Sequence, residues 1–162
     1  MDKPQSSLID ELLTANSAFL LAALGAESRR LFNAAVEQWG IGWPGQTVLT
    51  ALHALSRFGP MYQKQVADFA GIDPRNLGPV IDGLENSGLV ERQTSRDDRR
   101  IYQLQLTAQG RAKAKQIQSV RSKIEQNMTG CLSDKERESL HRLLMKVWEN
   151  SEVSEGFRSW IK

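Results

Sequence analysis

The fold of this chain is decided by residues 63–106, which read QKQVADFAGIDPRNLGPVIDGLENSGLVERQTSRDDRRIYQLQL. The pattern predicts two short helices joined by a turn at Gly71, followed by a two-stranded hairpin with an arginine-rich tip. Glycine is suited to this turn because it takes positive φ without a steric penalty. The order of elements is typical of a winged helix-turn-helix, in which one helix enters the major groove of DNA and the hairpin reaches the neighbouring minor groove.

The second predicted helix has recognisable ends and one apolar face. Asp73-Pro74 favours a helix start, since Asp is a good N-cap and Pro fits the first helical position. Gly88 predicts the end of the helix as its C′ residue. The apolar positions recur at helical spacing and are expected to pack against the first helix: Leu77, Val80, Ile81 and Leu84. The turn alone is also compatible with an ordinary pair of packed helices that binds no nucleic acid.

The predicted hairpin favours nucleic-acid binding. Its first strand would run from Leu89 to Thr94, and in the second strand Tyr102, Leu104 and Leu106 alternate with glutamines, as in a half-buried strand. Residues 95–100, SRDDRR, would form the tip. A charged run is usually a solvated loop, but a basic tip directly after a recognition helix lies where DNA phosphates would be.

The charge distribution agrees with this interpretation. The whole chain has 21 basic and 19 acidic residues and a net charge of +2. Residues 89–123 contain nine Lys or Arg and three acids, a local charge of +6, whereas residues 1–88 contain six and nine, a local charge of −3. The positive charge is therefore concentrated on the hairpin and the segment after it, as expected for a surface that faces phosphates. For Arg111, Lys113 and Lys115, solvation of a long helix remains an alternative.

Composition restricts the class of protein. A chain of 162 residues with 40% hydrophobic content predicts one compact domain with its own core. No segment has the length of a membrane span and the first 17 residues do not form a signal peptide, so we expect a cytoplasmic protein. The single cysteine, Cys131, excludes an internal disulfide. We expect it to be a small buried apolar residue rather than a redox sensor. With only His53 and His141 as further ligands, the composition argues against a structural zinc site. No nucleophile–base pair or phosphate loop is present, so we expect neither an enzyme nor a cofactor.

The segments on both sides of the winged core are expected to form amphipathic helices. The N-terminal segment predicts one helix or a pair, Thr107 would cap a long helix, and Ser133 with Glu136 forms a capping box for the last helix. One interpretation is that these helices simply pack on each other. We favour a homodimer interface, which would place two recognition helices roughly 34–36 Å apart to match an inverted repeat.

The predicted fold is therefore mainly α with a small β-hairpin wing, in a single domain over residues 1–162. Residues 44–107 would form the winged helix-turn-helix core. Residues 1–43 and 108–162 would supply the dimerisation helices.

These motifs resemble those of the multiple antibiotic resistance regulator (MarR) family. The likeness extends from about Phe19 to Leu144 and rests on residues 19–25 (FLLAALG), 65–71 (QVADFAG), 84–90 (LENSGLV), 98–100 (DRR) and 106–110 (LTAQG). The resemblance implies an obligate dimer with a recognition helix in the major groove and a wing in the minor groove. It also implies repression that is relieved by a small, often aromatic, ligand.

The resemblance assigns roles to the wing residues. Arg100 matches the arginine that enters the minor groove, and Asp98 matches the acid that holds this arginine in place. Arg96 and Arg99 would flank the tip and contact phosphates.

The recognition helix departs from the family pattern. Its exposed start carries Arg75 and Asn76, which suit bidentate contacts to guanine and adenine, although Arg75 could equally bind a phosphate. Many relatives have Thr-Arg where this chain has Gly78-Pro79. A proline inside a helix loses one backbone bond and clashes with the carbonyl four residues earlier, at about 3 kcal/mol. Either the helix kinks, or regular helix begins near Pro79 and the two polar residues lie on its approach.

In the relatives the effector site lies between the terminal helices and the winged core. Phe32, Trp39, Trp43 and His53 lie in the segments that would line such a pocket, so they are candidate ligand contacts, although each is also compatible with a role in the core. The chain has no cysteine near its N-terminus, which argues against the peroxide-sensing branch of the family.

Two functions from different classes follow. The first is a dimeric, ligand-responsive repressor that binds double-stranded DNA. The alternative is a winged-helix module that binds another protein and no specific DNA. The basic wing favours the repressor, because protein-docking surfaces are usually depleted of charge at their centre.

Overall fold

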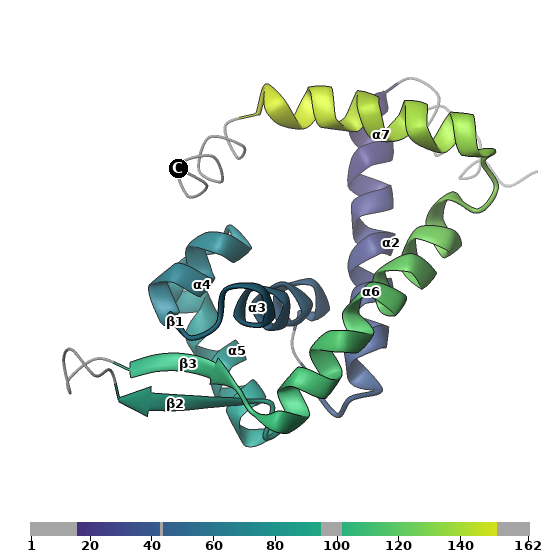
Figure 1. Cartoon of the computed structure of the whole chain (residues 1–162). Coiled ribbons are helices and arrows are strands. Elements are labelled where there is room, and N and C mark those ends of the chain that lie inside the picture. The colour runs from purple at the N-terminus through teal and green to yellow at the C-terminus, as the bar shows by residue number, and fades with distance from the viewer. Residues whose placement is uncertain (1–15, 43, 95–101, 152–162) are drawn as a thin grey trace, which may run out of the picture.

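A computed structural model describes residues 16–42, 44–94 and 102–151 (Figure 1). Its helices are α2 (Ser17–Glu37), α3 (Gly45–Phe58), α4 (Gln63–Ala70), α5 (Pro74–Asn86), α6 (Ala108–Thr129) and α7 (Asp134–Glu149). Its strands are β1 (Met61–Tyr62), β2 (Val90–Thr94) and β3 (Tyr102–Leu106). The mainly helical fold with a small sheet confirms the predicted fold class.

The sheet is larger than the sequence predicts. The expected two-stranded hairpin is joined by β1, and the antiparallel order of the three described strands is β1-β3-β2. Leu104 pairs with Met61 on one side and Arg92 on the other. In β3, Leu104 and Leu106 are buried, but Tyr102 is 55% exposed. The predicted apolar face thus stops before Tyr102, which pairs with Thr94 at the end of the hairpin away from the core.

The core lies among α3, α4, α5 and the sheet. The predicted apolar face of α5 is confirmed, with every member at most 3% exposed: Leu77, Val80, Ile81 and Leu84. Burial of one such side chain contributes about 1.5–3 kcal/mol. Helix α3 is buried over most of its circumference, as expected of a helix enclosed by the other elements, through Val48, Leu49, Ala51, Leu52, Ala54 and Leu55.

The turn between α4 and α5 has the predicted conformation. Gly71 has φ of 65°, and the N–H groups of Gly71 and Ile72 donate to the carbonyls of Asp68 and Ala67 at 3.0 and 3.1 Å. These two bonds satisfy carbonyls at the end of α4 that have no partner within the helix. The chain can then reverse direction at once and start α5 at Pro74.

Helices α2, α6 and α7, here called the outer helices, extend to one side of the winged core (Figure 1). The N-terminal segment, which the sequence left as one helix or two, forms the single helix α2 over its described residues. Helix α7 lies at the end of α2 and α6 that is farthest from the sheet, and none of its residues is buried. Cys131, between α6 and α7, is exposed, so its predicted burial is wrong. None of the described helices is both long and apolar enough to cross a lipid bilayer.

Candidate nucleic-acid interface

The start of α5 is held by its N-cap. The Asp73 carboxylate accepts a hydrogen bond from the backbone N–H of Arg75 at 2.8 Å, and Pro74 occupies the first helical position. The helix then continues through Pro79 to Asn86. The alternative in which regular helix begins only near Pro79 is therefore excluded. Arg75 and Asn76 lie within the first turn of the helix.

Both polar residues of this first turn are exposed. The Arg75 guanidinium folds back on Asp73, with Nε and Nη2 donating to the two carboxylate oxygens at 3.2 and 3.0 Å. The hydrogen bonds from the Arg75 side chain and then its N–H hold the pKa of Asp73 below its ordinary value. The Arg75 side chain is nonetheless 90% exposed, so it can exchange this carboxylate for a phosphate or a guanine edge.

Arg92 attaches the hairpin to α5, a contact that was not predicted from the sequence. From β2 its guanidinium forms ion pairs with Asp82 and Glu85 on α5. Hydrogen bonding to Asp82 and the charges of both acids raise the pKa of Arg92. One cation of the basic segment is thus used inside the protein, where it compensates two acids on the helix expected to face DNA. The sequence does contain a signal for the ion pair with Glu85, because the opposite charges of Glu85 and Arg92 lie close together in the LENSGLVER stretch.

Two further cations of the basic segment have structural contacts. Arg111 Nη1 donates to the Leu106 carbonyl at 2.7 Å, and Lys113 Nζ lies 5.0 Å from the centroid of the Trp39 ring. Lys115 is exposed. The local charge of +6 therefore overstates the cations available to a partner.

The wing tip lies outside the described residues. Strand β2 ends at Thr94 and β3 begins at Tyr102, so no structure is given for Arg96, Asp98, Arg99 and Arg100. Their assignment to minor-groove and phosphate contacts stays a prediction.

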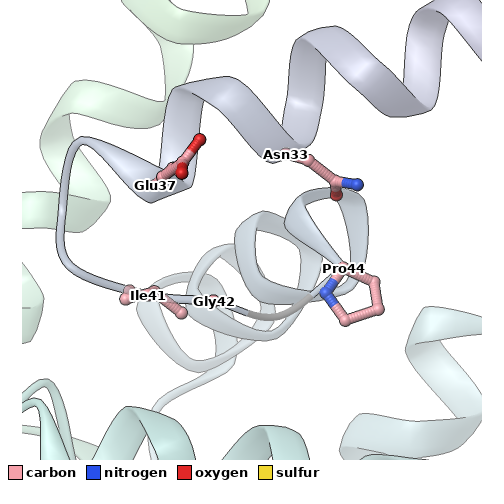
Figure 2. Close-up of a pocket in the computed structure, with 5 residues that line it drawn as sticks. All are labelled: Asn33, Glu37, Ile41, Gly42 and Pro44. Carbon is pink, nitrogen blue, oxygen red and sulfur yellow. The ribbon is translucent and has the colours of Figure 1, made fainter.

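The candidate effector residues are not brought together at one described cavity. Phe32 and Trp39 are partly buried and pack against the core, His53 is half-buried on α3, and Trp43 lies outside the described residues. A cavity of about 360 Å³ lies at the α2–α3 connection (Figure 2). Its lining is Asn33, Glu37, Ile41, Gly42 and Pro44. The described cavity is lined by neighbours of Trp43 in the sequence, but by none of the four candidate residues. Their role as ligand contacts stays a prediction.

His53 should make the stability of the protein depend on pH. Burial lowers the pKa of His53, and the charges of Arg121 and Arg57 lower it further. The unfolded chain, with an ordinary histidine pKa of about 6.5, therefore takes up the proton first. The contribution of His53 to the free energy of unfolding is therefore complete above pH of about 6.5. It is lost progressively as the pH falls toward the lowered pKa of His53 in the folded protein.

The test is urea unfolding between pH 7.5 and 5.5 of the wild type and of His53→Gln. The free energy of unfolding of the variant should fall less over this range. An equal fall in both proteins would contradict a role for His53.

The fold and the exposed first turn of α5 beside a hairpin define a winged helix-turn-helix protein. The model of the MarR family matches residues 46–102, which run from the start of α3 to the start of β3. The winged core of this chain therefore matches a MarR-family domain, and the resemblance drawn from the motifs is confirmed.

Solved structures extend this likeness beyond the core. A probable transcriptional regulator from Pseudomonas aeruginosa is 27% identical with a TM-score of 0.71, over 83% of this chain and 98% of that chain. The Mycobacterium tuberculosis MarR family protein Rv2887, in complex with p-aminosalicylic acid, is 26% identical with a TM-score of 0.63, over 82% and 98%. The transcriptional repressor CouR, bound to a 23-mer DNA duplex, shares the fold at 24% identity and a TM-score of 0.70, over 83% and 94%.

Proposed function

We propose that this protein is a homodimeric transcriptional repressor of the cytoplasm that binds an inverted-repeat operator and is released by a small aromatic ligand. The observation that carries the proposal is the first turn of α5, where Arg75 and Asn76 are exposed on a helix whose opposite face is buried. Residues at the start of a recognition helix are the ones that reach base edges. The duplex bound to CouR, a protein of the same fold, supports this use of the fold.

The outer helices support a dimer. Large apolar side chains between 36% and 60% exposed gather on the first half of α2 and on α7: Phe19, Leu20, Leu21, Leu24, Leu140, Leu143, Leu144, Met145, Val147 and Trp148. A groove of about 510 Å³ lies between α2, α6 and α7. Contiguous apolar surface of this kind marks an interaction site, and a second copy of α7 supplies a matching apolar face.

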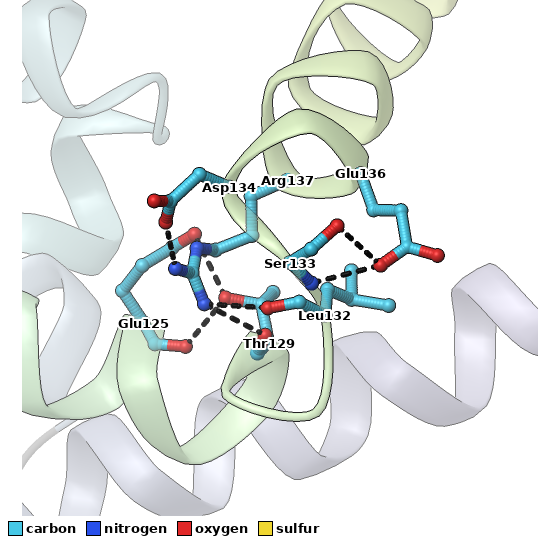
Figure 3. A network of polar contacts seen from close by, with 7 residues as sticks. All are labelled: Glu125, Thr129, Leu132, Ser133, Asp134, Glu136 and Arg137. Carbon is cyan, nitrogen blue, oxygen red and sulfur yellow. Dashed lines mark hydrogen bonds and ion pairs between the residues drawn. The ribbon is translucent and has the colours of Figure 1, made fainter.

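The direction of α7 is held by a polar corner (Figure 3). Arg137 Nη1 donates to the Leu132 carbonyl at 2.8 Å, and Arg137 also pairs with Asp134. The Glu136 carboxylate accepts from the N–H and hydroxyl of Ser133 at 2.8 and 2.7 Å, so the predicted pairing of these two residues is confirmed. The Arg137 contacts set the angle at which α7 leaves α6 and presents its apolar residues. The bonds between Ser133 and Glu136 stay within the cap of α7.

The proposed effector is a small aromatic acid. The complex of Rv2887 with p-aminosalicylic acid supports this class of ligand for a relative of the same fold. The proposed site lies between the outer helices and the winged core, where Phe32, Trp39, Trp43 and His53 are the candidates.

Asn76→Ala should reduce the preference for an operator. A duplex enriched from a random library by the wild type supplies the operator, and a duplex of scrambled sequence supplies the reference. Loss of one bidentate base contact is expected to cost about 1–3 kcal/mol of discrimination in fluorescence anisotropy titrations. Asn86→Ala, at the opposite end of α5, is the matched control and should keep the preference. Equal weakening on both duplexes would show that Asn76 only positions the protein.

Arg100→Ala should weaken binding to both duplexes and leave the dimer intact, because the proposed contact lies in the minor groove beside the backbone. Arg29→Ala, an exposed arginine of α2, is the control. The affinity is measured by anisotropy and the mass by sedimentation. Unchanged affinity in Arg100→Ala would count against the wing assignment.

A further inference from the structure

Helix α6 begins directly against the end of α5. The Thr107 hydroxyl donates to the carbonyl of Gly88 at 2.6 Å and accepts from the N–H of Gly110 at 3.0 Å. The backbone N–H of Thr107 also donates to the carbonyl of Leu89 at 3.1 Å. One side chain therefore caps α6 and bonds to the residue that ends α5.

Gly88 and Leu89 are in turn continuous with the last turn of α5. Their N–H groups donate to the carbonyls of Glu85 and Leu84, both at 2.9 Å. This pair of bonds closes the helix end and makes its last carbonyls part of one rigid turn. The carbonyl that Thr107 binds therefore moves with α5, and Thr107 itself moves with α6.

We propose that Thr107 is a positioning residue for the recognition helix, which it fixes to α6 at one end. The inference rests on the proposed function, since it concerns the use of α5 on DNA. The buried face of α5 fixes the helix against the core, and the Thr107 joint fixes its angle to α6. Through α6 this angle is connected to α7, where the second subunit is proposed to bind.

The length of α5 makes this angle important. At 1.5 Å per residue, Arg75 and Asn76 lie roughly 15–20 Å from the joint. A tilt of about 10° at the joint would therefore move them by roughly 3 Å. A displacement of that size breaks a direct hydrogen bond to a base edge, which tolerates a few tenths of an ångström. Non-specific phosphate contacts from flexible side chains would tolerate it better.

Substitutions at Thr107 separate the two bonds of its hydroxyl. Thr107→Ser keeps both the donor and the acceptor. Thr107→Asp keeps a good N-cap acceptor but replaces the donor to Gly88 with a carboxylate that cannot donate. Thr107→Ala removes both bonds. Ser133→Ala, in the cap of α7, serves as the control for a helix cap lost away from α5.

The test is the ratio of affinities for the enriched operator duplex and a scrambled duplex, measured by anisotropy on the full chain. Thr107→Ser should keep the wild-type ratio. Thr107→Asp and Thr107→Ala should lower it by roughly tenfold, the equivalent of one weak base contact. Ser133→Ala should lower the melting temperature by roughly 2–4 °C and keep the ratio.

A specificity ratio separates positioning from general destabilisation, since every variant is measured at a temperature where it is folded by circular dichroism. If Thr107→Asp does not fold, the comparison of Thr107→Ala with Ser133→Ala decides. A wild-type ratio in Thr107→Asp and Thr107→Ala, or an equal loss in Ser133→Ala, would overturn this inference and leave the proposed function standing. A wild type that shows no preference for any duplex would overturn the proposed function and the inference with it.

Discussion

Replacement of Leu143 and Leu144 with glutamate is expected to convert the protein to a monomer and to weaken its binding to an inverted-repeat duplex by about 10²–10⁴-fold. The two side chains are 53% and 41% exposed on α7. In the proposed dimer they are buried against the second subunit, where an unpaired carboxylate is strongly unfavourable. The loss on DNA is large because two linked half-site contacts bind far more tightly than one.

The control for this pair of substitutions is Lys135→Gln with Arg142→Gln, which changes the net charge by the same amount at exposed polar positions of α7. This control should remain a dimer and keep most of its affinity. Sedimentation gives the mass and anisotropy gives the affinity for the operator. A glutamate variant that stays dimeric, or that binds the operator normally as a monomer, would contradict the proposed interface.

Gly110→Ala is expected to lower the free energy of unfolding by about 3 kcal/mol, at the upper end of what overpacking costs, and the melting temperature by roughly 6–12 °C. A Cβ at this position would lie 1.9 Å from the Leu89 carbonyl oxygen and 2.9 Å from its carbon. Neither atom belongs to a flexible side chain, so α6 would have to move away from the end of α5. This cost exceeds the roughly 0.5–1 kcal/mol by which alanine is otherwise favoured over glycine within a helix.

The matched control is Gly25→Ala in α2. The nearest atom to its added Cβ is Arg29 Nη1 at 3.6 Å, at the end of a flexible side chain. This variant should be slightly more stable than the wild type, by up to about 1 kcal/mol in urea unfolding. If the two alanine variants behave alike, the close approach of α6 to Leu89 is wrong.

The elements that were predictable from the sequence depend on neighbouring residues. Gly71 as a turn residue and Asp73-Pro74 as a helix start act within about four positions along the chain, and both are confirmed. The buried face of α5 and the cap of α6 at Thr107 follow from similar local rules. The Gly78-Pro79 departure left the start of α5 open, because local rules disfavour a proline that the packed helix tolerates.

The features that could not be predicted depend on contacts between distant segments. Strand β1 has only two residues and exists because Met61 pairs with Leu104. The bond from Thr107 to Gly88 and the ion pairs of Arg92 likewise appear only when α5, the hairpin and α6 come together. For Cys131, composition predicted burial, but its place between α6 and α7 leaves it exposed.

We propose that two copies of this chain bind one duplex through α5 and the basic wing. Titration of the enriched operator duplex tests this assembly, with the mass of the complex measured and the affinity followed as salt is raised. We expect two chains per duplex and an affinity that falls on the order of 10³–10⁵ between 50 and 200 mM salt. A single chain on the duplex, or an affinity that does not change with salt, would contradict the claim and favour a module that binds another protein.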